Sequence, residues 1–346
     1  LLQALLLLSL LLPLQLSSLL LPSELPVLPC RESGSTLRFF IPLALVLRTR
    51  AEMRGSSRLM ERGISVYEEL FAHKGVSVEK SSDCIRLSGR LEAGEYTLRG
   101  DVSSQFITGL LFALPLLEGE STLNILPPVE SRSYIDITVD VLGKFGIRVE
   151  QTGENSFRIP GSQTYLPHAE TVESDWSNAA FLEALNFCGG QVQVEGLRTD
   201  SRQGDRVCVD MLRALHTPGV SLDLSDCPDL GPVLFAMAAA GGGAAFTGIR
   251  RLRIKESDRV LAMAQELAKF GIETQIEENR AVILPGTLQT PTQTLDAHND
   301  HRIAMALSVL CTRTGGVIEG VECVRKSYPS FFEAIGSLGV EEKLEA

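Results

Sequence analysis

The chain has 346 residues, of which 44% are hydrophobic and 22% charged, a composition typical of a globular protein of about two domains. Its formal net charge of −11 argues against a nucleic-acid groove, because binding a phosphate backbone requires a broad basic surface. The charge does not argue against small anionic substrates, since a few convergent arginines and lysines create a local positive site in an acidic protein. The seven cysteines are scattered without a C-x-x-C pair, which argues against a zinc site or a disulfide framework and predicts a reducing compartment, the cytoplasm.

Residues 1–23 form a Leu-rich stretch without any charged residue. The stretch is nearly long enough to span a bilayer. Two prolines inside it, Pro13 and Pro22, and the lack of a basic flank before it argue against a membrane anchor or a signal sequence. We therefore interpret residues 1–23 as a leader that is not native to the fold, with an anchor or signal as the alternative, and expect no membrane partner.

An internal repeat runs through the rest of the chain. In each copy an amphipathic helical pattern ends at a glycine, and two short strands follow. Gly75, Gly146 and Gly271 stand where a helix C-terminus requires a left-handed residue. The residues after them alternate apolar and polar, as in a sheet with one buried face, and Asn155 and Asn279 fall where the strand pairs turn. The copies span residues 67–89, 136–161 and 260–286, with a weaker copy ending at Pro218-Gly219.

Between these copies lie helices of another kind, which begin with a polar cluster and are then apolar nearly all round, as in 106–117, 230–240 and 303–310. Such helices are buried. The pattern predicts an α/β (α+β) fold of two similar repeat domains with buried helices, over residues 24–170 and 171–346. A domain of three repeats needs one more copy at its start, so we expect the first domain to be truncated.

The starts of the buried helices are the first candidate binding positions. A helix N-terminus offers free backbone N–H groups and the positive end of the helix dipole to an anion. The stretch 33–36, with Gly34 at its centre, and the triplet Ser103, Ser104 and Gln105 add hydroxyls and an amide at such positions. Ordinary N-capping is the alternative role of each cluster.

Arginines and lysines recur beside these helix starts. Guanidinium groups bind phosphate and carboxylate oxygens in pairs, whereas lysine acts as a point charge. Each one taken alone is better explained as a solvated surface charge, but their recurrence at corresponding places in the repeat favours an anion site. The cations in question are Arg38, Arg62, Arg253, Lys255, Arg259, Arg302 and Lys326.

Three side chains are candidates for acid–base chemistry. Asp229 lies in a polar turn before an apolar helix, Glu256 lies between Lys255 and Asp258, and His301 lies in the sequence HNDHR. A general base requires a carboxylate or imidazole whose pKa is tuned by its neighbours. Asp229 could instead be a helix N-cap, and Glu256 an ion-pair partner of a nearby arginine.

In this order the motifs resemble the 5-enolpyruvylshikimate-3-phosphate synthase family over most of the chain. They are ESGSTLR from Glu32, then RLMER, DVSSQF, ESRSYIDIT, DCPDLGPVL, RIKESDR, HNDHRIAM and RKSYPSFFE ending at Glu333. The resemblance implies two domains of βαβαββ repeats that close over the substrates, as in enolpyruvyl transferases. It also implies transfer of the enolpyruvyl group of phosphoenolpyruvate to the 5-hydroxyl of shikimate 3-phosphate by addition and elimination, without metal or cofactor, in a monomer.

The resemblance implies roles for individual residues. Asp229 would be the base on the attacking hydroxyl, Glu256 a proton relay at the methylene of phosphoenolpyruvate, and His301 a helper. Shikimate 3-phosphate would be bound by Ser103, Ser104, Gln105, Ser131, Tyr134, Asp229 and Lys255. Phosphoenolpyruvate would be bound by Gly34, Arg62, Arg259, Arg302 and Lys326.

Three departures from the family pattern accompany this resemblance. The family's N-terminal Gly-Ser-Lys-Ser type loop is not found, Gly63 replaces the usual proline after Arg62, and Arg251 stands where many relatives have asparagine. Two alternatives remain at this point. One is the related carboxyvinyl transferase that acts on UDP-N-acetylglucosamine, and the other is a non-catalytic homologue.

Overall fold

A computed structural model describes residues 25–343, so the Leu-rich leader lies outside the described residues. The chain divides into two compact units, Leu1–Val172 and Glu173–Ala346, where the sequence pattern placed a boundary at residues 170/171. Within residues 25–343, no helix is long and apolar enough to cross a membrane.

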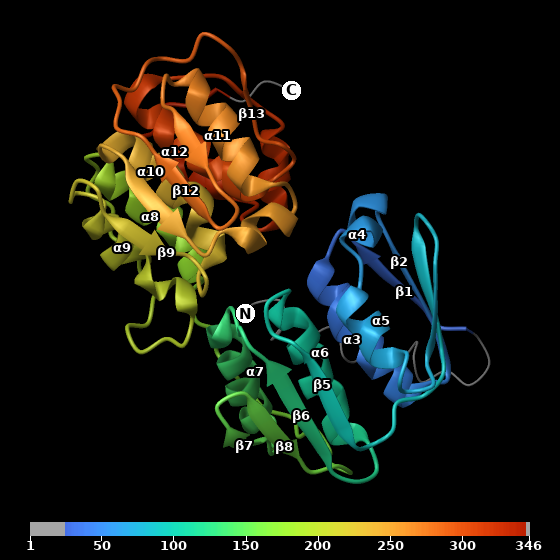
Figure 1. The fold of residues 1–346 in the computed structure, drawn as a ribbon. Helices are drawn as coiled ribbons and strands as arrows, with labels where there is room; N and C mark the ends of the chain where they lie inside the picture. Colours follow the sequence, from blue (N-terminus) through green and yellow to red (C-terminus); the bar gives the residue numbers. More distant parts are fainter. Residues whose placement is uncertain (1–24, 344–346) are drawn as a thin grey trace. The chain divides into compact units, whose positions relative to one another are not determined.

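The first unit contains two copies of a βαβαββ motif (Figure 1). The first copy comprises β1 (Val27–Arg31), α3 (Gly34–Leu47), β2 (Arg50–Gly55), α4 (Ser57–Arg62), α5 (Ser65–Phe71), β3 (Ser77–Lys80) and β4 (Cys84–Ser88). The second comprises β5 (Glu95–Arg99), α6 (Ser104–Ala113), β6 (Ser121–Leu126), α7 (Arg132–Lys144), β7 (Glu150–Gly153) and β8 (Ser156–Ile159).

The second unit contains a third copy and further helices around it. The copy comprises β9 (Ser221–Asp223), α10 (Gly231–Gly241), β10 (Ala244–Thr247), α11 (Arg259–Lys269), β11 (Thr274–Ile276) and β12 (Arg280–Ile283). The other elements are α8 (Trp176–Phe187), α9 (Cys208–Ala214), β13 (Leu295–Asp296), α12 (His301–Thr314), β14 (Ile318–Glu319) and α13 (Phe331–Ser337).

The three copies have the same sheet topology. Their strand orders are β1-β2-β4-β3, β5-β6-β8-β7 and β9-β10-β12-β11. In each, the first two strands pair in parallel and the hairpin pairs antiparallel, as a helical crossover followed by a tight turn requires. The predicted α/β fold class is therefore confirmed.

The predicted glycine positions follow the last helix of each copy. Gly75, Gly146 and Gly271 follow α5, α7 and α11 with φ of 68°, 78° and 79°, a left-handed conformation that costs other residues more than glycine. Asn155 lies in the β7–β8 turn and Asn279 in the β11–β12 turn, also as predicted.

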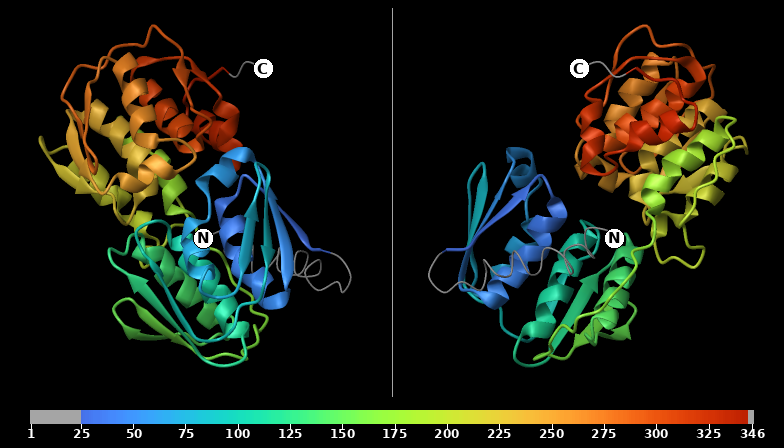
Figure 2. Two further views of the ribbon diagram at one scale, coloured as in Figure 1. Left: turned by 45° about the vertical axis from the view of Figure 1, so that its right-hand side comes forward. Right: turned by 180° about the vertical axis from the view of Figure 1, so that it is seen from behind.

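The predicted buried helices form the centre of each unit. In the first unit, α3 and α6 lie against each other between the two sheets, as the views of Figure 2 show. In the second, every residue of α10 from Gly231 to Ala239 is buried, and each large apolar side chain so buried contributes about 1.5–3 kcal/mol. One helix is shorter than the pattern 106–117 predicts. α6 ends at Ala113 and a 3-10 turn follows, because Pro115 has no N–H for a further helical bond.

Candidate functional site

In the first unit, the starts of α3 and α6 come together. Ser33 caps α3 by accepting a hydrogen bond from the Thr36 amide at 3.1 Å, and Ser103 caps α6 by accepting one from the Gln105 amide at 3.3 Å. Ser33 and Ser103 therefore do cap their helices, which was the alternative role of these clusters. The clusters also make a contact beyond capping, because Gln105 Nε2 donates to Ser35 Oγ across the two helices at 2.9 Å.

Two arginines border Gly34 at the same place. Arg38 Nη1 donates to Gln105 Oε1 at 2.7 Å. A β-carbon added to Gly34 would lie 3.2 Å from Arg38 Nη1, 3.3 Å from Gln105 Oε1 and 3.5 Å from Arg62 Nη2. The glycine thus leaves room for an anion to approach the helix N-terminus between two guanidinium groups. Arg38 was noted in the sequence but given no site role, and the structure adds it to Gly34 and Arg62.

Ser131 and Tyr134 lie at the start of α7 in the same unit. Ser131 is fully buried and left-handed, with φ of 55°, at the position before the helix. The carbonyl of Tyr134 accepts a hydrogen bond from Thr138, whose hydroxyl also lies 2.9 Å from that of Thr108 on α6. The start of α7 is thereby fixed against α6, the helix that begins with Ser104.

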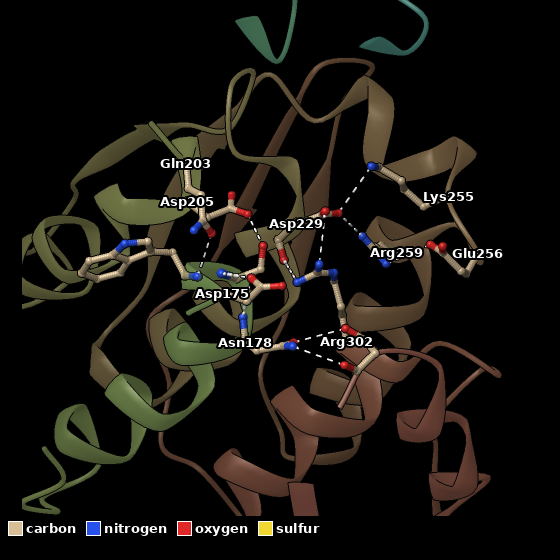
Figure 3. A network of polar contacts seen from close by, with 12 residues as sticks. Asp175, Asn178, Gln203, Asp205, Asp229, Lys255, Glu256, Arg259 and Arg302 are labelled. Atoms are coloured by element: carbon tan, nitrogen blue, oxygen red, sulfur yellow. Dashed lines mark hydrogen bonds and ion pairs between the residues drawn. The ribbon is translucent and has the colours of Figure 1, made fainter. Parts of the chain in front are cut away.

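In the second unit, Asp229 is surrounded by three cations, two from the stretch 255–259 and one from α12 (Figure 3). Its carboxylate lies 3.4 Å from Lys255 Nζ, 2.8 Å from Arg259 Nη1 and 3.2 Å from Arg302 Nη2. Because α10 begins without a side-chain cap, the alternative interpretation of Asp229 as an N-cap is wrong. The side chain serves the cation cluster instead.

Arg259 is held by three carboxylates and is almost completely buried. Besides Asp229, it pairs with Glu256 through Nη2 at 2.9 Å and with Asp300 through Nε at 2.8 Å. Glu256 is therefore the ion-pair partner that the spacing suggested, and it still lies within this cluster. Asp300 is fully buried and also caps α12 by accepting from the Arg302 amide at 3.0 Å.

These neighbours set the protonation of the cluster. Burial disfavours the charged form of Asp229, but Arg302, Lys255 and Arg259 outweigh it and hold the pKa of the carboxyl well below its usual range. Burial lowers the pKa of Lys255 to about 8, against the opposing attraction of Asp229. Arg251, at 5% exposure, adds a positive charge that lowers the pKa of Lys255 further.

His301 and Lys326 lie beside the same cluster. Burial, together with Arg302 and Arg259, lowers the pKa of His301 to about 4, so the imidazole is neutral at pH 7. Its Nδ1 atom is buried and has no hydrogen-bond partner among the described residues. Lys326 Nζ donates to the carbonyl and side-chain oxygens of Asn299 at 3.0 and 2.8 Å, just before α12.

Two further carboxylates that the sequence patterns did not single out as site residues lie near Arg302. Asp205 is buried and accepts a hydrogen bond from Ser177 Oγ; burial and the charge of Asp229 raise its pKa to about 6. Asp175 caps α8 through the Ser177 amide at 2.8 Å. The only sequence signal for Asp175 was its position in a polar cluster before an apolar helix, and Asp205 had none.

The chain is an α/β protein of repeated βαβαββ motifs. Arginines, lysines and carboxylates lie together at the N-termini of its helices, an arrangement suited to binding small anions. Residues 15–335 match the family model described as EPSP synthase (3-phosphoshikimate 1-carboxyvinyltransferase), and the chain belongs to this family.

Two curated relatives named 3-phosphoshikimate 1-carboxyvinyltransferase support that membership. The Clostridium kluyveri protein is 43% identical over 91% of this chain and 79% of its own length. The Clostridium acetobutylicum protein is 38% identical over 92% and 79%.

Two solved structures share the fold. EPSP synthase from Acinetobacter baumannii has a TM-score of 0.65 at 23% identity, over 92% of this chain and 79% of that one. The enolpyruvyl transferase NikO from Streptomyces tendae has a TM-score of 0.67 at 17% identity, over 88% and 76%.

Proposed function

We propose that this chain transfers the enolpyruvyl group of phosphoenolpyruvate to the 5-hydroxyl of shikimate 3-phosphate and releases inorganic phosphate. The proposal is supported by the name that the Clostridium relatives carry. It rests above all on one observation, the mostly buried carboxylate of Asp229, 17% exposed, with Lys255, Arg259 and Arg302 within 3.4 Å. Such a group can bind an anionic substrate and place a base beside it.

The substrate assignments follow from the two sets of side chains. In the first unit, Gly34 and Arg62 would contact phosphoenolpyruvate, and the polar groups at the starts of α6 and α7 would bind shikimate 3-phosphate through Ser103, Ser104, Gln105, Ser131 and Tyr134. In the second unit, Arg259, Arg302 and Lys326 would bind phosphoenolpyruvate, while Lys255 and Asp229 contact shikimate 3-phosphate. Fixed cations that meet the charges of two polyanions provide positioning and electrostatic stabilisation.

The chemistry is an addition followed by an elimination. The substrate oxygen bonds to C2 of phosphoenolpyruvate as its proton leaves to Asp229 and another proton is delivered to C3. The C2–O bond to phosphate then breaks, and a proton leaves C3 to restore the double bond. Glu256, 2.9 Å from Arg259, is proposed as the relay for the protons at C3, with the neutral His301 as its helper.

Asp229 needs a higher pKa than its three cations allow if it is to accept a proton. An anionic substrate that engages Arg259 and Arg302 would draw these charges away from the carboxylate and raise its pKa. Substrate binding would therefore switch Asp229 from an ion-pair partner to a base. We also propose that the chain works as a cytoplasmic monomer.

The test is phosphate release from phosphoenolpyruvate by the purified chain, with and without shikimate 3-phosphate. We expect release that depends on shikimate 3-phosphate and falls about 10²–10⁴-fold in Asp229→Asn. Asp226→Asn is the matched control, because it changes the same charge at an exposed position three residues away. Binding of shikimate 3-phosphate without phosphate release would contradict the proposal and indicate a non-catalytic member of the family.

A further inference from the structure

Helix α3 contains a proline in its interior, and this leaves one carbonyl without its regular partner. In an α-helix, the amide of each residue bonds the carbonyl four positions earlier. Pro42 has no N–H, so it cannot donate to the carbonyl of Arg38. A buried carbonyl that loses its donor costs free energy unless another group supplies a hydrogen bond.

The replacement donor comes from another helix. Tyr67 of α5 is fully buried, and its hydroxyl lies 2.8 Å from the Arg38 carbonyl. The same hydroxyl lies 2.9 Å from the carbonyl of Phe106 on α6. A phenol has one proton to donate, so the two carbonyls share it. Burial raises the pKa of Tyr67 well above its usual value, which keeps that proton in place.

The contact requires the two helices to approach closely. Gly109 lies on α6 where a β-carbon would overlap both the Tyr67 hydroxyl and the Arg38 carbonyl. The aromatic rings add to the fit, since the Tyr67 ring meets the Phe106 ring edge-on at 4.8 Å between centroids. The Arg38 guanidinium also lies over the Phe106 ring, 4.8 Å from its centroid. Tyr67 thus joins α3 and α6 near their N-termini, at the fifth residue of α3 and the third of α6.

We propose that Tyr67 is a positioning residue that fixes the register of α3 against α6 and thereby assembles the anion site of the first unit. The site depends on that register, because Gln105 on α6 must reach both Ser35 at 2.9 Å and Arg38 at 2.7 Å on α3. The inference rests on the proposed function for its kinetic readout. The simpler alternative is that the hydroxyl only satisfies the carbonyl left by Pro42.

A pair of variants separates these two roles. Tyr67→Phe removes the hydroxyl, and we expect it to raise KM for phosphoenolpyruvate about tenfold, the effect of one lost hydrogen bond, while kcat stays within about threefold. Pro42→Ala restores an amide for the Arg38 carbonyl without joining α3 to α6. The double variant should therefore recover thermal stability and keep the raised KM. A double variant that restores KM as well would overturn the positioning role.

Tyr165→Phe is the matched control. Its partly buried hydroxyl donates to the Phe112 carbonyl at 2.8 Å, near the other end of α6, so the variant loses a tyrosine–carbonyl bond without removing the one to α3. We expect a lower Tm with an unchanged KM, and an equal rise in KM in this variant would also overturn the inference. A crystal structure of Tyr67→Phe decides the matter even if the wild-type chain releases no phosphate. Retained Gln105–Ser35 and Arg38–Gln105 contacts would refute the inference, and their loss would support it.

Discussion

The substitution Asp300→Asn tests whether the second unit depends on its buried charge cluster. Asp300 is completely buried and accepts from Arg259 Nε at 2.8 Å, Arg259 Nη2 at 3.2 Å and Ser257 Oγ at 3.1 Å, besides the capping bond from the Arg302 amide. Asparagine keeps one oxygen that can accept the capping bond, but its NH2 group replaces the other oxygen. That NH2 group would face the N–H of Arg259 and the hydroxyl of Ser257, which also donate. It also leaves Arg259, at 1% exposure, with less charge compensation.

The magnitude follows from this geometry. Removing one partner of a buried ion pair costs about 3–5 kcal/mol, and we expect the lower end because the cap survives. A loss of about 3 kcal/mol is a large part of the 5–15 kcal/mol that typically stabilises a domain. Asp258→Asn is the control, since Asp258 caps α11 at 3.0 Å from the Leu261 amide and its side chain is about one-third exposed. That change should cost less than about 1 kcal/mol, because asparagine caps as well as aspartate.

The assay is urea unfolding followed by tryptophan fluorescence. The chain has a single tryptophan, Trp176 in α8, which is buried in the same unit as Asp300 and therefore reports on that unit alone. If Asp300→Asn unfolds within about 1 kcal/mol of the wild type, or no more easily than Asp258→Asn, the buried pair does not stabilise the unit and the reasoning fails.

Two further predictions concern Gly34 and His301. Gly34→Ala places a β-carbon against Arg38 and Gln105, so we expect KM for phosphoenolpyruvate to rise about tenfold, a loss near that of one hydrogen bond, while helix propensity keeps the Tm equal or higher. An unchanged KM would contradict this expectation, because it would show that the side chains of Arg38 and Gln105 can move aside without weakening substrate binding. Because the folded-state pKa of His301, about 4, lies below its ordinary 6.5, the unfolded chain binds the proton first as pH falls. His301 by itself should lower the stability by about 2 kcal/mol between pH 7.5 and 5, while Asp205, whose folded-state pKa of about 6 lies above its ordinary value, acts in the opposite direction. His301→Gln, compared with the wild type by urea unfolding at both pH values, should therefore lose about 2 kcal/mol less than the wild type over this range.

The sequence by itself determined the repeat and the chemistry of the candidate site. Gly75, Gly146 and Gly271 were predicted correctly because a helix end that needs a left-handed residue is a local requirement. The starts of the buried helices could also be predicted, since a polar cap followed by an all-apolar stretch is typical of a helix that lies in the core. The family followed from the order of the motifs, which the family match over residues 15–335 confirms.

Only the tertiary structure decided which partners these residues have. Asp229 and Arg302 are 73 positions apart in the sequence, so no local pattern could show that the guanidinium and the carboxylate meet at 3.2 Å. The same holds for Asp205, whose raised pKa comes from burial and from Asp229 across the fold. In the sequence Tyr67 was only the first residue of the repeat copy 67–89, and its role depends on a proline in α3 and a glycine in α6. The sequence states the type of each side chain. The pKa and the hydrogen bonds of that side chain depend on neighbours that only folding brings within a few ångströms.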